Sequence, residues 1–343
     1  MSELVDRLAD LTAHRDRDLL DVTLVTSLHE MFLPQLVAVH RAVGDAGGER
    51  WLTRARMARD DVAASADNTL AQFDQLPPLD DRPQWRDCLR GQQVLTLDGS
   101  DGPPAVTLFP LTTDAGPIGV LEVRSERPLL PSERRAVGSI LRICRNFESL
   151  LDYSERDTLT GLLNRKTFDN AFLKLALAPM SGTEGGVERR AGAEVEHFLG
   201  VIDIDHFKRV NDGFGHLIGD EVLLLMSRLM RATFRYHDRL YRFGGEEFVV
   251  LLHCADASCA GVAFERLRAN VEQYVFPQVG AITVSVGFSR IRPHDTPAAA
   301  FERADRAVYF AKGHGRNQVS CHETLVAGGQ LDEGPQVGDV ELF

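Results

Sequence analysis

Two short apolar runs, Leu240–Phe243 and Phe248–Leu252, are separated by two glycines and two adjacent glutamates. Both runs contain residues that favour strands. The Gly244–Gly245 pair can adopt the positive φ values that a tight connection needs. The pattern therefore predicts a β-hairpin with Glu246 and Glu247 at its tip.

The elements around this hairpin follow the order β-α-β-β-α-β, which is the ferredoxin-like arrangement of palm domains. Periodicity predicts strands at Phe198–Asp205 and Ala281–Phe288, and helices at Ile218–Phe234, Ala260–Tyr274 and Pro297–Ala311. In such a sheet the first strand lies beside one strand of the hairpin. Asp203 and Glu246 are therefore expected to meet.

Converging carboxylates repel one another unless a cation lies between them. Oxygen ligands without histidine or thiolate partners favour Mg²⁺ or Mn²⁺, and magnesium normally shares its shell with substrate phosphates. Glycines beside the acids let a bulky anion approach the backbone. A solvated turn is the alternative reading of the Gly-Gly-Glu-Glu segment alone, but four further polar residues favour a site for metal-complexed nucleotide: Asp203, Asp205, Asn211 and Asp220.

Length and charge limit the other possibilities. A chain of 343 residues suggests two domains, and a net charge of −12 without a basic block argues against binding to nucleic acid or anionic membrane. No apolar run approaches the roughly 20 residues of a membrane span, and the acidic start does not resemble a signal peptide.

Five cysteines without paired spacing suit a reducing compartment, so a cytoplasmic protein is expected. His253, Cys254 and Cys259 lack a fourth zinc ligand, and a surface loop is expected there.

The first part of the chain has a mixed α+β pattern. A helix from Asp16 is expected to end at Pro34. Strands are predicted at Leu36–Val43, Arg50–Met57, Gln93–Leu97, Ala105–Leu111 and Gly119–Val123. The closing hairpin, Phe109–Val123, and the helix that follows resemble the end of a GAF domain. This resemblance implies a sensory domain over residues 1–130.

Residues 131–156 form a predicted connecting helix. Its apolar residues fall on 3-4 spacing, namely Val137, Ile140, Cys144, Phe147 and Leu151. A stripe of this kind can be the seam of a coiled coil with a second chain, or it can pack on the helix's own domain. Both readings remain open at this point.

Four ordered motifs resemble those of GGDEF-domain diguanylate cyclases. They are Asp157–Arg165 (DTLTGLLNR), Asp203–Asp220, Gly244–Phe248 (GGEEF) and Ala311–Asn317 (AKGHGRN). The resemblance runs from about Tyr153 to Cys321 and implies an α+β, palm-type cyclase domain over residues 157–321. It implies an enzyme that condenses two GTP molecules into cyclic di-GMP and releases two pyrophosphates.

The resemblance also implies roles for single residues. Asp203, Glu246 and the carbonyl of Ile204 would hold magnesium. Glu247 would orient or deprotonate the attacking hydroxyl. The phosphates would contact the amides of His206 and Phe207 and the side chains of Lys208, Lys312 and Arg316, while guanine would be read by Asn211 and Asp220. Asn211 and Asp220 could instead cap helices, and Lys312 and Arg316 could be cations at a helix C-terminus. Asp205 is expected to be structural. No catalytic or metal-binding role is expected for the His206 and His216 side chains.

One such domain holds one GTP, so the resemblance implies a homodimer that the connecting helix and the sensory domain control. Arg235–Asp238 matches the family's inhibitory Arg-x-x-Asp motif, and Arg266 would complete this product-binding site from the partner chain. A helix-end ion pair is the alternative for a lone Arg-x-x-Asp.

The resemblance leaves two segments without a role. Ser181–Glu194 lengthens a loop, and the acidic tail 322–343 is expected to be disordered. A catalytically silent module that binds GTP or cyclic di-GMP is the alternative function. A cyclase with mixed adenine and guanine products is a lesser alternative, which Asp220 disfavours.

Overall fold

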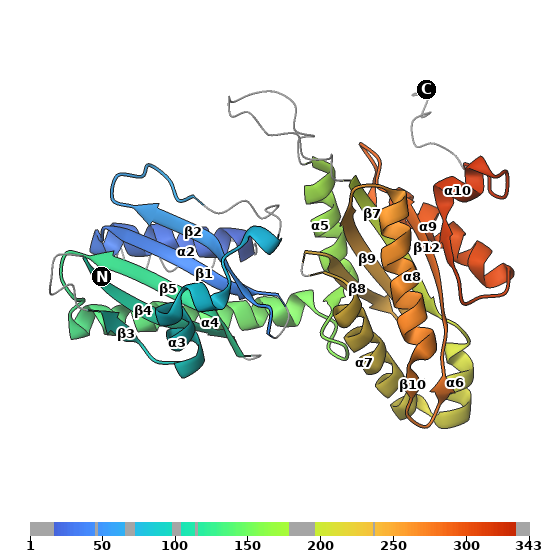
Figure 1. Ribbon diagram of the computed structural model, residues 1–343, viewed down its shortest axis with the longest axis horizontal. Coiled ribbons are helices and arrows are strands. Elements are labelled where there is room, and N and C mark those ends of the chain that lie inside the picture. The colour runs from blue at the N-terminus through green and yellow to red at the C-terminus, as the bar shows by residue number, and fades with distance from the viewer. Residues whose placement is uncertain are drawn as a thin grey trace. The chain divides into compact units, whose positions relative to one another are not determined.

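The computed structural model describes residues 17–44, 47–65, 73–97, 104–113, 116–177, 196–235 and 237–333. The chain divides into two compact units, Met1–Ser154 and Glu155–Phe343 (Figure 1). The 181–194 loop and residues 334–343 lie outside the described part of the chain. Within the described ranges, no helix has the length and hydropathy that a membrane crossing requires.

The first unit contains a five-stranded antiparallel sheet with the strand order β2-β1-β5-β4-β3. Its strands are β1 (Leu36–Val43), β2 (Arg50–Ala58), β3 (Leu95–Leu97), β4 (Ala105–Thr113) and β5 (Gly116–Ser125). The five strands predicted for this part of the chain are confirmed, with small shifts at their ends. The short helices η1 (Phe73–Gln75) and η2 (Leu79–Asp81) and the helix α3 (Pro83–Gly91) were not predicted.

Two long helices, α2 (Arg17–Phe32) and α4 (Pro131–Glu155), pack on one face of this sheet, and α3 packs on the other. The apolar stripe of α4 lies in this core, since Val137, Ile140 and Cys144 are buried against the sheet and α2. The stripe therefore packs on its own unit, and the coiled-coil reading of these residues is wrong.

A buried ion network also fixes α4 to the sheet. The Arg41 guanidinium on β1 lies 2.6 Å from Asp21 of α2 and 2.7 Å from Glu148 of α4. A buried arginine needs such partners because leaving its charge unpaired away from water is costly. Asp21 and Glu148 satisfy that need, so the network ties the second half of α4 to its sheet.

The second unit is built on a six-stranded sheet with the order β13-β12-β7-β9-β8-β6. Its strands are β6 (Leu163–Asn164), β7 (Glu196–Ile204), β8 (Arg239–Gly244), β9 (Glu247–Cys254), β12 (Val284–Arg290) and β13 (Val319–Cys321). A separate small ribbon pairs β10 (Val275–Phe276) with β11 (Gly280–Ala281). The four central strands are antiparallel, and β7 lies between β9 and β12 as a ferredoxin-like order requires.

Helices cover both faces of this sheet (Figure 1). They are α5 (Arg165–Leu177), α6 (Phe207–Phe214), α7 (His216–Thr233), α8 (Ala257–Gln273), α9 (Pro297–Gly313) and α10 (His322–Ala327). The residues of β7 alternate between the two faces: Phe198 and Ile202 pack with α7 and α8, while Leu199 and Val201 pack with α9. The predicted β-α-β-β-α-β order is confirmed, and α5 and α6 are additions to it.

Two predicted boundaries are wrong. The single strand expected over Ala281–Phe288 is interrupted, since Ala281 pairs with Val275 in the small ribbon and β12 begins only at Val284. The segment expected to be a disordered tail begins with α10, whose His322 and Leu325 side chains are buried against the domain. Burial of these side chains stabilises a helix in a segment whose charge pattern alone suggested disorder.

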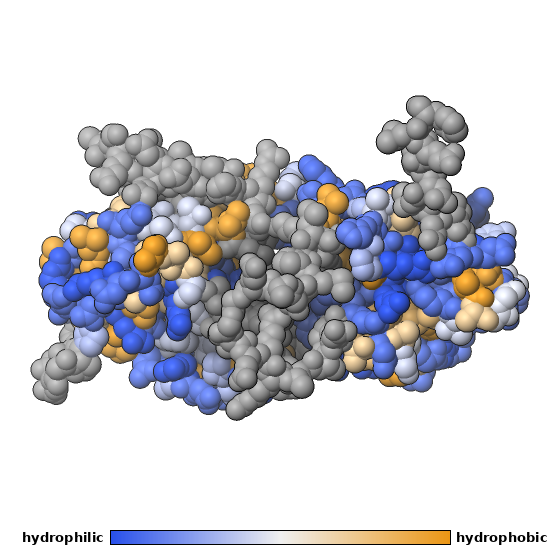
Figure 2. Space-filling model, turned by 90° about the horizontal axis from the view of Figure 1, so that it is seen from above, coloured by the Kyte–Doolittle hydropathy of each residue, from blue (hydrophilic) through white to orange (hydrophobic). Residues whose placement is uncertain are grey.

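The face of the molecule in Figure 2 is mostly hydrophilic over the described residues, with small and separate hydrophobic patches. Scattered apolar side chains of this kind are normal on a protein surface. On that face, the drawn residues therefore offer charged and polar groups rather than one continuous apolar surface.

Candidate functional site

Three carboxylates meet where β7 ends and the β8–β9 hairpin turns. Asp203 on β7 lies directly opposite Glu247 on β9 in the strand register, and Glu246 precedes Glu247 in the turn. The turn depends on its glycines, since Gly244 has φ 147° and Gly245 has φ 51°. The expected meeting of Asp203 with the hairpin tip is confirmed, with Glu247 as its cross-strand neighbour.

One cation reaches this acidic edge from α9. The Lys312 Nζ atom lies 2.7 Å from Asp203 Oδ2, and Lys312 belongs to the last turn of α9. Arg316 lies just beyond this helix with its side chain exposed. The structure therefore pairs Lys312 directly with Asp203, while the Arg316 side chain is exposed beyond the end of α9.

The electrostatics of the edge reflect crowded negative charge. Burial raises the pKa of Asp203, Glu246 and Glu247 above the usual range, and neighbouring carboxylates raise it further. The charge of Lys312 acts in the opposite direction on all three groups. The cluster therefore carries a charge that one lysine does not fully balance.

Asp205 has a structural role, as the sequence predicted. Its carboxylate accepts hydrogen bonds from the hydroxyls of Thr283 and Ser285 at 2.7 Å each and from the backbone N–H of Asn317 at 3.1 Å. These bonds tie the end of β7 to β12 and to the segment that follows α9. Asp205 thus holds the Ala311–Asn317 motif near the acidic edge.

A short helix begins directly after β7. His206 adopts a left-handed conformation with φ 58°, and α6 starts at Phe207. The first turn of a helix presents backbone N–H groups that lack partners within the helix, and it favours anions. Lys208 in that turn is exposed. The α6 start therefore has the features of a phosphate-binding segment next to Asp203.

The residues expected to read guanine lie at the junction of α6 and α7. A Cβ atom at Gly219 would lie 2.0 Å from Asn211 Oδ1, so the absence of a side chain there leaves room for Asn211. Asp220 follows Gly219 on α7 and is exposed. The structure thus places Asn211 and Asp220 near one another at this junction.

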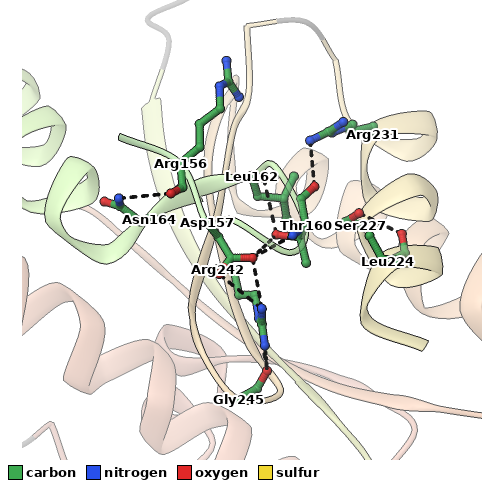
Figure 3. A network of polar contacts seen from close by, with 10 residues as sticks. All are labelled: Arg156, Asp157, Thr160, Leu162, Asn164, Leu224, Ser227, Arg231, Arg242 and Gly245. Carbon is green, nitrogen blue, oxygen red and sulfur yellow. Dashed lines mark hydrogen bonds and ion pairs between the residues drawn. The ribbon is translucent and has the colours of Figure 1, made fainter. Parts of the chain in front are cut away.

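A polar network centred on Arg242 also supports the hairpin turn (Figure 3). The Arg242 guanidinium on β8 donates to both Asp157 carboxylate oxygens at 3.0 and 3.2 Å and to the Gly245 carbonyl at 2.9 Å. Asp157 also accepts from the backbone N–H and the hydroxyl of Thr160. The motif at the start of the second unit therefore fixes the backbone of the Gly-Gly-Glu-Glu turn.

Sequence reasoning missed two charged residues at the site. Asp305 on α9 raises the pKa of Glu247 by its charge, and Arg165 at the start of α5 lowers it. Asp305 precedes Lys312 by two helical turns and so shares its face of α9, a spacing that could have revealed it. Arg165 lies over the ring of Phe243, which no local pattern predicts.

The expected inhibitory segment lies near the opposite end of β9. The Asp238 carboxylate accepts a hydrogen bond from the Arg235 backbone N–H at 2.8 Å, and the Arg235 side chain is exposed. Arg266 on α8 donates to the Thr233 carbonyl at 2.7 Å, directly before this segment. The chain thus gathers Arg235, Asp238 and Arg266 in one region, away from Glu247.

The surface loop expected around Cys254 and Cys259 is absent from this region. Cys254 is the buried last residue of β9, and Cys259 lies in the first turn of α8. Asp256 caps this helix by accepting from the Cys259 backbone N–H.

The sheet order and the acidic edge define a palm-type α+β domain. Comparison with known families agrees, because residues 154–318 match the family described as diguanylate cyclase, GGDEF domain. Residues 154–318, which apart from Ser154 lie in the second unit, therefore form a GGDEF domain.

Similar proteins share this part of the chain. Diguanylate cyclase DgcP of Pseudomonas aeruginosa is 41% identical over 166 residues, which are 48% of this chain and 23% of that protein. The response regulator PleD of Caulobacter vibrioides is 36% identical over 221 residues, or 59% of this chain and 45% of PleD. The chain thus spans less than half the length of these two relatives. The crystal structure of the GGDEF domain of DgcB from Caulobacter crescentus with c-di-GMP has 34% identity, covers 49% of this chain and 96% of that domain, and has a TM-score of 0.43.

Proposed function

We propose that the chain is a diguanylate cyclase that condenses two GTP molecules into cyclic di-GMP and two pyrophosphates. One observation carries this proposal: Asp203, Glu246 and Glu247 meet at one edge of the sheet, beside Lys312 and the start of α6. At this edge, metal-bound phosphates would lie next to the Glu247 carboxylate, which could accept a proton from an attacking hydroxyl. The diguanylate cyclase DgcP supports the same reaction by its similarity.

The donor set fits a divalent cation of the magnesium type. Among the described residues, no three histidine, cysteine or acidic side chains form a metal site by themselves. Magnesium does not need such a cage, because it takes one or two carboxylates and fills its shell with water and substrate phosphates. Asp203, Glu246 and the Ile204 carbonyl would hold it. When bound, the ion would neutralise charge on the phosphates and lower the pKa of the attacking hydroxyl.

The remaining groups would orient the nucleotide. Backbone N–H groups of His206 and Phe207 would hold the terminal phosphates, with Lys208, Lys312 and Arg316 as cations around them. Asn211 and Asp220 would read guanine, because a carboxylate accepts hydrogen bonds from donors that adenine lacks. Glu247 would orient the attacking 3′-hydroxyl and accept its proton.

Each domain would bind one GTP, so the reaction needs two chains that face each other. Proximity of the two bound nucleotides would then supply much of the rate. The first unit would regulate this assembly as a GAF-like sensory domain, with α4 as the connection. Its antiparallel sheet flanked by helices on both faces supports this role. Because GTP is a cytoplasmic substrate, the proposed activity requires a cytoplasmic location.

The product would inhibit the enzyme through a second site. Arg235 would contact guanine O6 and N7, as arginine does in nucleic acids, and Asp238 would accept from the opposite donors. Arg266 would complete the site from the partner chain. A separate site is supported by the exposed Arg235 side chain and by the place of its segment just before β8, whose start pairs with the half of β9 farther from Glu247.

The direct test is incubation of the full chain with GTP and Mg²⁺, followed by chromatographic detection of cyclic di-GMP. Formation of the dinucleotide from GTP is expected, and ATP should give no cyclic product. Binding of GTP without any product would instead identify a catalytically silent module. Mixed adenine and guanine products would contradict the guanine-reading role of Asp220.

A further inference from the structure

Two thiols face each other where β9 ends and α8 begins. The Cys259 Sγ atom lies 3.0 Å from Cys254 Sγ, and the short connection between them contains the helix-capping Asp256. A disulfide bond has an S–S length of about 2.05 Å, so closing this gap needs a shift of only about 1 Å. The fold itself therefore holds these two sulfurs close to bonding distance.

The two thiols have different surroundings. Cys254 is 8% exposed, and burial raises its pKa to about 12. Cys259 is half-buried and belongs to the first turn of the 17-residue α8. Cys259 is thus the group that a soluble oxidant can reach, and Cys254 is positioned to react with it.

We infer that Cys254 and Cys259 form a redox-active dithiol that hydrogen peroxide converts into an intramolecular disulfide. The Cys259 sulfur attacks hydrogen peroxide, so an S–O bond forms, the O–O bond breaks, and the leaving hydroxide takes the Cys259 proton to give one water. The Cys254 sulfur then attacks Cys259, the S–S bond forms, the S–O bond breaks, and hydroxide leaves with the Cys254 proton as a second water. Two thiols lose two electrons in total, and the peroxide gains them.

The position of this dithiol connects it to the neighbouring segment. The charges of Asp238 and Arg235 act on the Cys254 thiol, so oxidation takes place beside the proposed product-binding site. The acidic edge lies at the other end of β9, at Glu247. The bond would therefore fix the end of β9 to the start of α8 without acting on the acidic edge directly.

The other cysteines provide an internal comparison. Cys88 and Cys144 are buried in the first unit, and burial raises the pKa of each to about 12. Cys321 is half-buried like Cys259, and its Sγ atom lies 3.4 Å from a Glu323 carboxylate oxygen rather than beside a sulfur. Selective loss of the Cys254 and Cys259 thiols is therefore expected.

The test uses the full chain, fully reduced and then treated with a small excess of hydrogen peroxide. Alkylation after unfolding, read by intact mass, should fall from five thiols to three, since the chain has five cysteines and the disulfide removes two. Peptide mapping should show the Cys254–Cys259 link, and a thiol reductant should restore all five. Neither measurement depends on cyclase activity, so the result stands or falls independently of the proposed function.

Matched variants make the result specific. Cys321→Ser should still form the disulfide, whereas Cys254→Ser and Cys259→Ser should not. Five alkylatable thiols after oxidation, a link between two chains, or irreversible oxidation of Cys259 without a disulfide would each overturn the inference. A variant that fails to fold does not decide the matter, because the wild-type mapping already does.

Discussion

At the scale of single residues, the carboxylates of the acidic edge weaken the fold that holds them. Their pKa values are raised, so the folded state binds protons more tightly than the unfolded chain does. Stability from these groups therefore falls as the pH rises through their titration range. Carboxylates with pKa values raised in this way cluster at functional sites of proteins.

We expect Glu247→Gln to reduce cyclic di-GMP formation by about 10²–10³-fold, the range typical for removing one charge-stabilising group at a transition state. The same change should leave melting temperature unchanged or higher without metal, because it removes a crowded charge. Initial rates and thermal unfolding measured on one preparation check both expectations.

Glu302→Gln is the matched control for this prediction, since Glu302 is an exposed acid on α9. It should keep normal turnover. Near-normal turnover of Glu247→Gln would contradict the role assigned to that residue. Glu246→Gln should also lose activity, since Glu246 is proposed to hold the metal.

Arg235→Ala tests the proposed inhibitory site. Losing one guanine contact should cost about 1–3 kcal/mol and raise the inhibition constant roughly tenfold to hundredfold. The initial rate should remain, because Arg235 lies away from the acidic edge. Progress curves with and without added cyclic di-GMP, together with calorimetry, measure both quantities. If the variant binds the dinucleotide as tightly as wild type, the segment forms only a helix-end contact.

The titration of His253 should make the free energy of unfolding depend on pH. Burial, together with the nearby charges of His197, His237 and Arg239, lowers its pKa to about 4. An unfolded histidine titrates near pH 6.5, so the unfolded chain takes up the proton first. This contribution to stability is complete above about pH 6.5 and is lost as the pH falls toward 4. Urea unfolding of wild type and His253→Gln across this range should show a shallower pH dependence in the variant; identical slopes would contradict the assignment.

At the scale of elements, the hairpin turn depends on a contact far away in the sequence. Arg242 on β8 connects Asp157, at the start of the second unit, with the Gly245 carbonyl. Asp157 follows the end of α4 after a single intervening residue. The network therefore links the backbone of the Gly-Gly-Glu-Glu turn to the segment next to the connecting helix.

Arg242→Lys should lower kcat by about tenfold or more while GTP binding changes little, because lysine cannot make the forked contact to Asp157 and Gly245. Asp157→Asn should act in the same direction, and the two changes together should be less than additive. Arg239→Lys, an exposed arginine on the same strand, is the control. Additive effects in the double variant, or full kcat in Arg242→Lys, would show that the network does not position the turn.

At the scale of the whole molecule, each chain would bind only one of the two GTP molecules that the proposed reaction needs. Specific activity should therefore rise with protein concentration, and a forced-dimer fusion should remove this dependence. Rates measured from nanomolar to micromolar protein, with the oligomeric state followed by light scattering, provide the check. A proven monomer with full turnover would contradict the two-chain mechanism.

The order of elements in the second unit was predictable from the sequence, because local periodicity and turn residues act over short segments. Asp203 and the hairpin tip could be placed together for the same reason, once the β-α-β-β-α-β order was known. The position of α10 was not predictable, since burial of His322 and Leu325 against the domain overrides the acidic pattern around them.

Only the tertiary structure decided which side chains from distant parts of the chain meet. The Lys312–Asp203 ion pair, the Asp157–Arg242–Gly245 network and the Cys254–Cys259 contact all join residues from different elements. The use of the α4 stripe was decided in the same way, since its 3-4 spacing fits a coiled coil and a domain core equally well. Periodicity fixes which face of an element is apolar, whereas strand register and helix packing fix what that face meets, and these depend on the whole chain.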